Sequence, residues 1–178
     1  DYPRELTEVI VVDDTPDDAA RAAVEASTGR ALACTRYVHL AERATIGAKR
    51  SLGARLAADD LGCDVVATWD DDDVYGADRL RLQVEPIAAG DADATVATPR
   101  AWRYEAAGER PAEMTWFGGA LGSALAAVDA DCALGTFILD EAIASLCFRA
   151  ALHGGDADYP DASYDEDRAF VRAIMTSG

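Results

Sequence analysis

The stretch Val65-Val66-Ala67-Thr68-Trp69-Asp70-Asp71-Asp72-Asp73-Val74-Tyr75 decides the fold of this chain. It opens as a short apolar run rich in β-branched residues, which predicts a buried strand, and it ends in four adjacent acids. Like charges about 4 Å apart repel by roughly 4 kcal/mol at an effective dielectric near 20. The acids therefore indicate either a solvated turn or a place where a divalent cation neutralises them. The strand favours the cation, because open α/β sheets bind ligands at the carboxyl ends of their strands.

Strands and helices alternate on both sides of this stretch, which predicts an α/β fold with a mostly parallel central sheet. We expect strands at 8–14, 34–40, 65–69 and 94–98, and helices at 15–27, 47–61 and 77–88. Past Pro99 the pattern changes to short antiparallel strands, followed by a further strand at 135–139. The apolar segment 145–148 then leads into a short helix near His153, and Asp165 caps a last helix. Together these elements predict one domain with two halves, residues 1–98 and residues 99–178.

The composition excludes several classes of partner. The net charge of −17 argues against nucleic acid, whose phosphates require clustered Lys and Arg. No apolar run is long enough to span a bilayer and no leader is evident, so we expect a cytoplasmic protein without a transmembrane segment. The four cysteines are widely spaced, which favours reduced core thiols over disulfides or zinc.

A second pair of acids, Asp13-Asp14, follows the first predicted strand and precedes Thr15-Pro16, which we expect to open a helix. Such a strand end also occurs in receiver domains of response regulators, which would need a second, phospho-accepting Asp at a later strand end and a lysine beyond it. Lys49 is the only lysine, so the receiver hypothesis lacks its charge partner. A dehalogenase-type phosphatase would need its two acids one residue further apart.

Two further segments carry candidate chemistry. The basic segment Gly47-Ala48-Lys49-Arg50 lies at a predicted helix start, where N–H groups and basic side chains suit a phosphate, although a solvated turn is the alternative. The segment Tyr164-Asp165-Glu166-Asp167-Arg168 places acids in a first helical turn, where they cap the helix or supply a general base. His153 is interpreted as a structural residue more readily than as a metal or phosphate ligand.

Taken together, four segments resemble family 2 glycosyltransferases of the GT-A fold, which begin with one more strand and helix than we expect here. The segments are 9–14, 46–53 (with Ser51 in place of the usual Asn), 69–83 (with an Asp-x-Asp signature and Ala77 in place of the usual Pro) and 148–170 (with a Glu-Asp base motif). The resemblance implies a nucleotide-sugar-binding half at 1–98 and an acceptor-binding half at 99–178.

The resemblance also implies roles for individual residues. Asp14 would bind the nucleotide base, and Arg50 with Lys49 would lie near the ribose or diphosphate. Asp70 and Asp71 would approach the ribose and the metal shell. The ligands of Mg²⁺ or Mn²⁺ would be Asp72 and Asp73, and the general base would be Asp167, with Glu166 as second choice.

The implied reaction is a metal-dependent, inverting transfer of a sugar, by a hexosyltransferase-like enzyme, from a nucleoside diphosphate-sugar to a hydroxyl acceptor. Two alternatives stay open. A nucleotidyltransferase would release pyrophosphate and is expected to carry a Gly-rich, Lys-bearing first loop. A non-catalytic module would bind a nucleotide-sugar or a cation without turnover. The sugar, the nucleotide and the acceptor (a glycan, a lipid or a small molecule) are not predicted.

Overall fold

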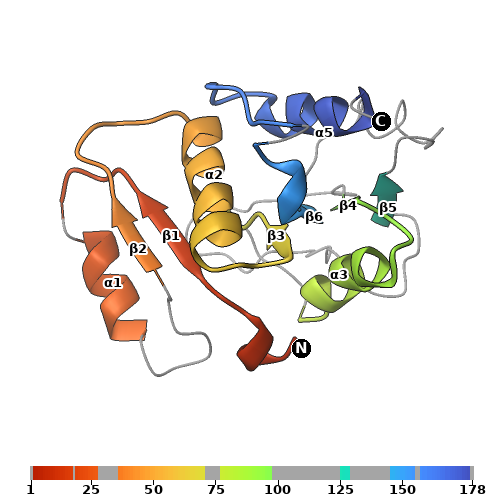
Figure 1. Cartoon of the computed structure of the whole chain (residues 1–178). Coiled ribbons are helices and arrows are strands. Elements are labelled where there is room, and N and C mark those ends of the chain that lie inside the picture. Colours follow the sequence, from red (N-terminus) through yellow and green to blue (C-terminus); the bar gives the residue numbers. More distant parts are fainter. Residues whose placement is uncertain are drawn as a thin grey trace, which may run out of the picture. The chain divides into compact units, whose positions relative to one another are not determined.

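The computed structural model describes residues 2–17, 19–27, 36–70, 77–97, 125–128, 145–154 and 157–176 (Figure 1). Its strands are β1 Ile10–Asp13, β2 Arg36–His39, β3 Val65–Ala67, β4 Ala94–Ala97, β5 Leu125–Val128 and β6 Ser145–Arg149. Its α-helices are α1 Ala19–Ser27, α2 Ile46–Arg55, α3 Arg79–Ala89 and α5 Glu166–Thr176. Short helical turns are η1 Arg4–Leu6, η2 Leu56–Asp60 and η3 Ala150–Leu152. This mixture confirms the predicted α/β class.

The chain forms two compact units. The central unit is Ala67–Phe148, and the terminal unit joins Tyr2–Val66 to Arg149–Gly178. Strands β3 and β6 each continue from one unit into the other. These units are structural groupings, so the functional halves 1–98 and 99–178 stay a prediction.

In the terminal unit, β1 and β2 form a parallel pair in which Ile10 lies opposite Arg36 and Asp13 opposite His39. Helix α2 packs against both β1 and α5 (Figure 1). The N-terminal part of α5 is acidic, but Phe170, Val171 and Ile174 are buried, as the sequence pattern predicts. This packing brings the end of β1 and the beginning of α5 to the same helix, α2.

Helix α1 begins later than expected. The prediction that Thr15 caps a helix opening at Pro16 is wrong, because α1 starts at Ala19. The backbone N–H of Ala19 donates to Asp17 Oδ1 at 3.0 Å, while the Thr15 hydroxyl donates to Asp13 Oδ1 at 2.8 Å. The Thr15 side chain therefore closes the turn after β1, and an aspartate two residues later supplies the acceptor at the helix start.

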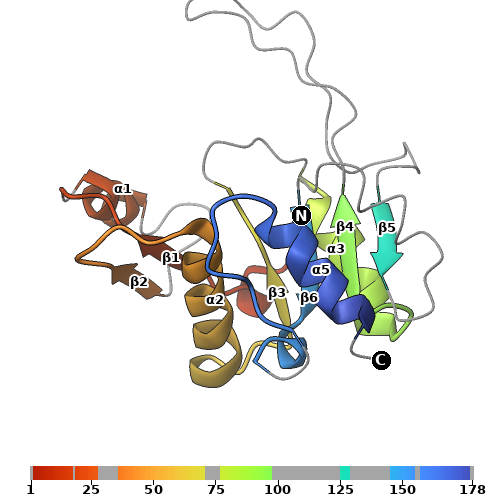
Figure 2. The ribbon, with the colours of Figure 1, turned by 90° about the horizontal axis from the view of Figure 1, so that it is seen from above.

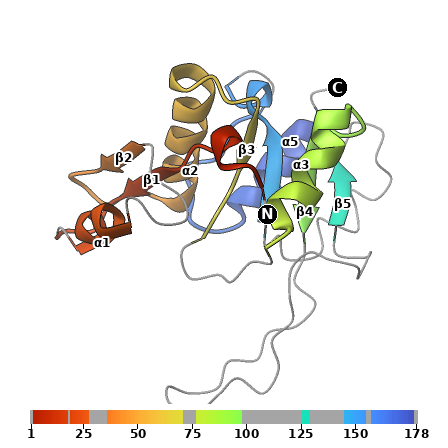
Figure 3. The same cartoon turned by 90° about the horizontal axis from the view of Figure 1, so that it is seen from below.

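In the central unit, the strands follow the order β3-β6-β4-β5, and β4 is antiparallel to both of its neighbours. Helix α3 packs against β4 (Figure 2; Figure 3). The buried core here includes Ile87 of α3, Val96 of β4, and Leu146 and Phe148 of β6. The described pairings are thus of both kinds, parallel for β1–β2 and antiparallel around β4.

The buried face of α3 differs from the predicted one. The spacing of Leu80, Val84 and Ile87 predicts an apolar inner stripe, but only Ile87 of these three is fully buried. Arg79 and Gln83 are buried instead. Polar side chains therefore occupy the interior at the start of this helix.

Two described cysteines are free thiols, as expected. Cys147 on β6 is fully buried, and burial raises its pKa to about 11, whereas Cys63 is partly exposed. Among the residues that the structure describes, no helix is long and apolar enough to cross a membrane.

Candidate active site

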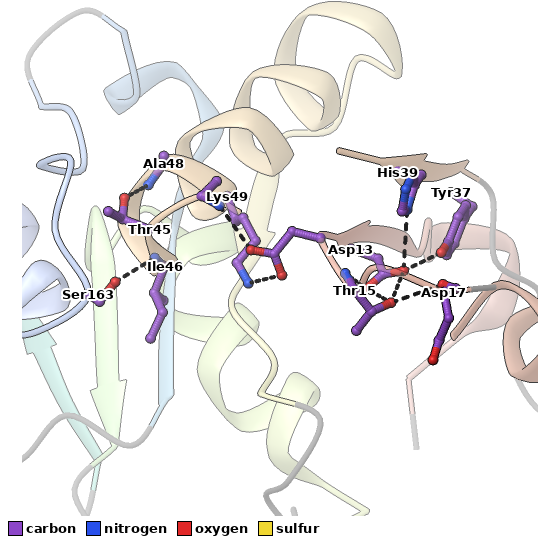
Figure 4. A network of polar contacts seen from close by, with 12 residues as sticks. Asp13, Thr15, Asp17, Tyr37, His39, Thr45, Ile46, Ala48, Lys49 and Ser163 are labelled. Atoms are coloured by element: carbon purple, nitrogen blue, oxygen red, sulfur yellow. Dashed lines mark hydrogen bonds and ion pairs between the residues drawn. The ribbon is translucent and has the colours of Figure 1, made fainter. Parts of the chain in front are cut away.

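The two acids that end β1 make different contacts. The Asp13 carboxylate accepts hydrogen bonds from the Tyr37 hydroxyl, from Thr15 N at 3.0 Å and from the Thr15 hydroxyl, and His39 Nδ1 lies 3.7 Å away (Figure 4). The Tyr37 hydrogen bond is the main cause that lowers the pKa of Asp13 from 3.8 to about 2, against the opposing effect of burial. Asp13 therefore links β1 to β2 and to the following turn.

Asp14 contacts the beginning of α2. Its Oδ2 accepts a hydrogen bond from Ala44 N at 3.0 Å, and its Oδ1 lies 3.1 Å from the Lys49 ammonium. The Ala44 N–H, followed by Lys49, lowers the pKa of Asp14. The carboxylate is buried, while Lys49 is 28% exposed. Two residues that the sequence assigns to the nucleotide-sugar thus lie side by side.

The first turn of α2 does not offer free N–H groups to a phosphate. Ile46 N donates to Ser163 Oγ at 3.4 Å, Gly47 N donates to Ala162 O at 2.8 Å, and Ala48 N donates to the Thr45 hydroxyl at 3.1 Å. Thr45 is the N-cap of the helix. The expectation that these N–H groups bind a ligand is therefore wrong, because the turn before α5 and the cap already accept from them. Any ligand contact from this turn would therefore have to come from its side chains.

Gly47 allows this close approach. A Cβ placed on Gly47 would lie 1.9 Å from the carbonyl oxygen of Pro160 and 3.0 Å from that of Ala162. Both atoms belong to backbone that cannot move aside as a flexible side chain would. The absence of a side chain at Gly47 thus lets α2 contact the segment that leads into α5.

Arg50 joins α2 to the two acids at the start of α5. Its Nη1 lies 2.9 Å from Glu166 Oε1 and also forms an ion pair with Asp167 Oδ2. The three side chains are 13%, 9% and 14% exposed, respectively. A charged group this well shielded is stable only when it is paired, so the three residues form one electrostatic unit.

An aromatic residue to which the sequence analysis assigned no role, Tyr159, interacts with these acids. Tyr159 is buried and stacks on Phe170, with ring centroids 4.2 Å apart and planes at 5°. Burial raises the pKa of Tyr159 well above its usual value, and the negative charge of Asp167 raises it further. Tyr159 was visible in the sequence only as part of the resemblance at 148–170, where no chemical role pointed to it.

His153 is buried and contacts other residues of the terminal unit. Its Nε2 lies 3.2 Å from the Ser51 hydroxyl and 3.4 Å from Asp158 Oδ1, and burial lowers its pKa. Its ring also lies 6.2 Å from that of Phe170. Ser51, which replaces the usual Asn of the resemblance, therefore contacts the terminal unit's only described buried histidine.

In the central unit, a buried arginine holds the strand end that precedes the acidic run. Arg79 Nε donates to Gln83 Oε1 at 2.8 Å and to Ser145 Oγ at 2.7 Å, and its Nη2 donates to the carbonyl oxygen of Thr68. The guanidinium also lies over the ring of Trp69, 4.5 Å from its centroid. Arg79 thus fixes the two residues that come directly before Asp70.

The predicted metal ligands Asp72 and Asp73, together with Asp71, lie outside the described residues. Asp70 is described and is partly exposed. Within the described ranges, no group of three His, Cys, Asp or Glu side chains lies close enough to hold a metal ion. The donor set itself fits Mg²⁺ or Mn²⁺, because consecutive carboxylates offer the hard oxygen ligands that these ions prefer.

The comparisons with known proteins give one match. A family model described as glycosyl transferase family 2 matches residues 1–139, which include Asp14, Lys49, Arg50 and the acids 70–73 but not α5. No curated protein and no solved structure matches the chain. Since the matched segment is well over half of the 178 residues, the chain belongs to the family 2 glycosyltransferases, whose members transfer a sugar from a nucleotide-sugar donor to an acceptor.

Proposed function

We propose that this protein is a metal-dependent, inverting glycosyltransferase with a GT-A architecture that transfers a sugar from a nucleoside diphosphate-sugar to a hydroxyl acceptor. One observation carries the proposal. Lys49 and Arg50, neighbours near the beginning of α2, contact Asp14 in one case and Glu166 with Asp167 in the other. A single helical turn thus joins an acid suited to the donor to acids suited to proton transfer.

On the donor side, we assign Asp14 to the nucleotide base and Lys49 to the diphosphate. A carboxylate has about four lone-pair sites, so Asp14 can accept from a base N–H in addition to Ala44 N and Lys49. Lys49 has three N–H donors and is partly exposed, so it can contact a phosphate while it keeps Asp14. The lowered pKa of Asp14 keeps this acceptor ionised at neutral pH.

On the metal side, we assign Asp72 and Asp73 to Mg²⁺ or Mn²⁺, with Asp70 and Asp71 near the ribose and the metal shell. The support for this assignment is chemical: four consecutive carboxylates follow a strand end that Arg79 holds through Thr68 and Trp69. When bound, a divalent cation supplies stabilisation of the negative charge that develops on the leaving diphosphate.

On the acceptor side, Asp167 would take the proton of the acceptor hydroxyl as that oxygen attacks the anomeric carbon, and Glu166 is the second choice. Arg50 contacts Asp167 through Oδ2, one of two carboxylate oxygens, and it keeps the side chain oriented. A single displacement needs one base and no covalent intermediate, so the anomeric configuration would invert.

The test is a transfer assay with a panel of nucleoside diphosphate-sugars, a mixture of acceptors and Mn²⁺. We expect Asp167→Asn to lower kcat by about 10²- to 10⁴-fold, as loss of a general base does. Asp72→Ala should remove most metal-dependent turnover. Asp165→Asn is the matched control for the base, because Asp165 is exposed and two residues away; it should keep full activity.

Each other outcome contradicts a specific part of the proposal. Full turnover of the Asp167→Asn variant would show that the general base is Glu166 or another residue. A retained anomeric configuration in the product, observed by NMR, would exclude single displacement. Release of pyrophosphate would identify a nucleotidyltransferase, and donor binding without any transfer or hydrolysis would identify a non-catalytic module.

A further inference from the structure

We propose that Arg50 is a positioning residue for the carboxylates of Glu166 and Asp167, and that it does not bind the donor. This inference rests on the proposed function, because it assigns a partner to the general base named there. It also revises the role that the resemblance implies for Arg50, which is contact with the ribose or diphosphate.

The first argument is the geometry of the contact. A single nitrogen of Arg50, Nη1, contacts both carboxylates: it lies 2.9 Å from Glu166 Oε1 and forms an ion pair with Asp167 Oδ2. Arginine keeps its charge at any pH at which the protein is folded. The two acids are neighbours in sequence and repel each other, so a fixed cation between them is needed to hold both in one place.

The second argument is the difference between Arg50 and its neighbour Lys49. Successive residues of an α-helix point about 100° apart, so the two side chains leave α2 in different directions. Lys49 extends toward Asp14 and is 28% exposed, whereas Arg50 extends toward α5 and is 13% exposed. A phosphate can therefore reach the ammonium more readily than the guanidinium.

The third argument is the cost of the alternative. If Arg50 turned to a diphosphate, Glu166 and Asp167 would remain adjacent, shielded from water and without this cation. Leaving a buried charge without its partner is among the more costly changes in a protein. Tyr159, whose pKa is raised by burial and by the charge of Asp167, adds a buried ring stacked on Phe170 to the surroundings of these acids.

A positioning role predicts a specific kinetic pattern. A base displaced by about 1 Å loses up to roughly 100-fold in rate, while the affinity for the donor is unaffected. We therefore expect Arg50→Gln to lower kcat by about 100-fold and to change the dissociation constant of the nucleoside diphosphate, measured by calorimetry with Mn²⁺, by less than about 3-fold. Arg168→Gln is the control, since it removes an arginine of α5 whose ion pair with Asp165 is partly exposed.

The decisive measurement is the double variant. If Arg50 acts through Asp167, then adding Arg50→Gln to Asp167→Asn should lower kcat by less than about 3-fold further. Multiplying effects, together with a tenfold or greater loss of nucleotide affinity, would show that Arg50 is a donor ligand and would overturn the inference. Arg50→Lys, which keeps the charge but loses the planar fork, answers the same question if the Gln variant does not fold.

Failure of the inference and failure of the proposed function give different results. An inactive wild-type protein would contradict the transferase proposal. The contact between Arg50 and Asp167 can then still be tested through the free energy of unfolding, measured by chemical denaturation. Coupling between Arg50→Gln and Asp167→Asn in the free energy of unfolding, with unchanged nucleotide affinity, would support the link to α5. Additive effects on unfolding with weakened nucleotide binding would reject it in an active and an inactive protein alike.

Discussion

The polar interiors of the two units are built differently. In the terminal unit, buried acids meet cations: Asp14 meets Lys49, and Glu166 with Asp167 meets Arg50. In the central unit, the buried cation Arg79 donates to neutral oxygens, those of Gln83, Ser145 and Thr68. Among the described contacts, the terminal unit thus holds ion pairs, whereas the central unit holds a guanidinium that is hydrogen-bonded to neutral oxygens.

We expect this difference to correspond to a difference in role, with the ion pairs taking part in the reaction and the Arg79 network supporting the fold. Ionised acids with defined partners can bind a base edge, orient a phosphate or accept a proton, and small changes in charge alter their function. A guanidinium that donates to neutral groups cannot exchange protons, but it fixes the backbone of the strand end that it contacts. We therefore expect changes in the first network to act mainly on turnover or pH dependence, and changes in the second to act mainly on stability.

The largest effect on stability should come from the central unit. Arg79→Leu removes donors from Gln83, Ser145 and the Thr68 carbonyl, and buried acceptors without donors are costly, so we expect a loss of about 3 kcal/mol in the free energy of unfolding. Urea denaturation followed by circular dichroism measures it. Arg81→Leu, on the same helix but exposed and paired only with Glu85 among described ion pairs, should change stability by less than about 0.5 kcal/mol. Equal losses in both variants would remove the distinction between the two sites.

A smaller effect is expected where α2 meets the segment before α5. Gly47→Ala forces a methyl group against the Pro160 carbonyl, so we expect a loss of about 2 kcal/mol and weaker activity, because Arg50 would shift with the helix. Gly53→Ala is the matched control. Its Cβ would lie 3.8 Å from a methyl group of Val12, so the better helix propensity of alanine should stabilise the protein by up to about 1 kcal/mol. A stable, active Gly47→Ala protein would refute this account of the contact.

The smallest effect concerns acid sensitivity in the terminal unit. Because the folded pKa of Asp13 is lowered from 3.8 to about 2, this group contributes stability that is present above pH 4 and is lost as the pH falls toward 2; the shift corresponds to about 2 kcal/mol. Tyr37→Phe removes the main cause, so it should cost about 1 kcal/mol at pH 7 and less at pH 2.5. Urea midpoints at both pH values measure this. Tyr164→Phe, at an exposed tyrosine, is the control, and an identical loss for Tyr37→Phe at both pH values would contradict the assignment.

Periodicity predicted most of the described secondary structure. Strands β1, β2, β3 and β4 and helices α2, α3 and α5 form where the pattern of apolar residues predicts them, because those patterns report burial directly. Strand β6 was not predicted as a strand, since its apolar segment was expected only to lead into a short helix, and the strand expected at 135–139 lies outside the described residues. The predicted start of α1 was wrong, because the Thr15 hydroxyl donates a hydrogen bond to the nearby Asp13 carboxylate and does not cap the helix. The predicted inner face of α3 was wrong in part, because side-chain hydrogen bonds to Ser145 of β6 make the burial of Arg79 and Gln83 favourable.

The sequence predicts candidate site residues one at a time, but it does not predict which of them contact one another. Acids at strand ends and helix starts can be recognised locally, so Asp14, Glu166 and Asp167 were identified as candidates. The contact of Arg50 with Glu166 joins residues 116 positions apart, and no local pattern encodes such a distance. The same holds for Ser51 and His153, which are 102 positions apart.

The thiol of Cys147 provides a natural probe of breathing motions in the central unit. It lies on β6 opposite Thr95 of β4, fully shielded, and with a pKa of about 11 it is almost entirely un-ionised at neutral pH. An alkylating reagent can modify it only after the strands around it separate. The rate at which Cys147 is alkylated would therefore report the frequency of local opening of this sheet under native conditions.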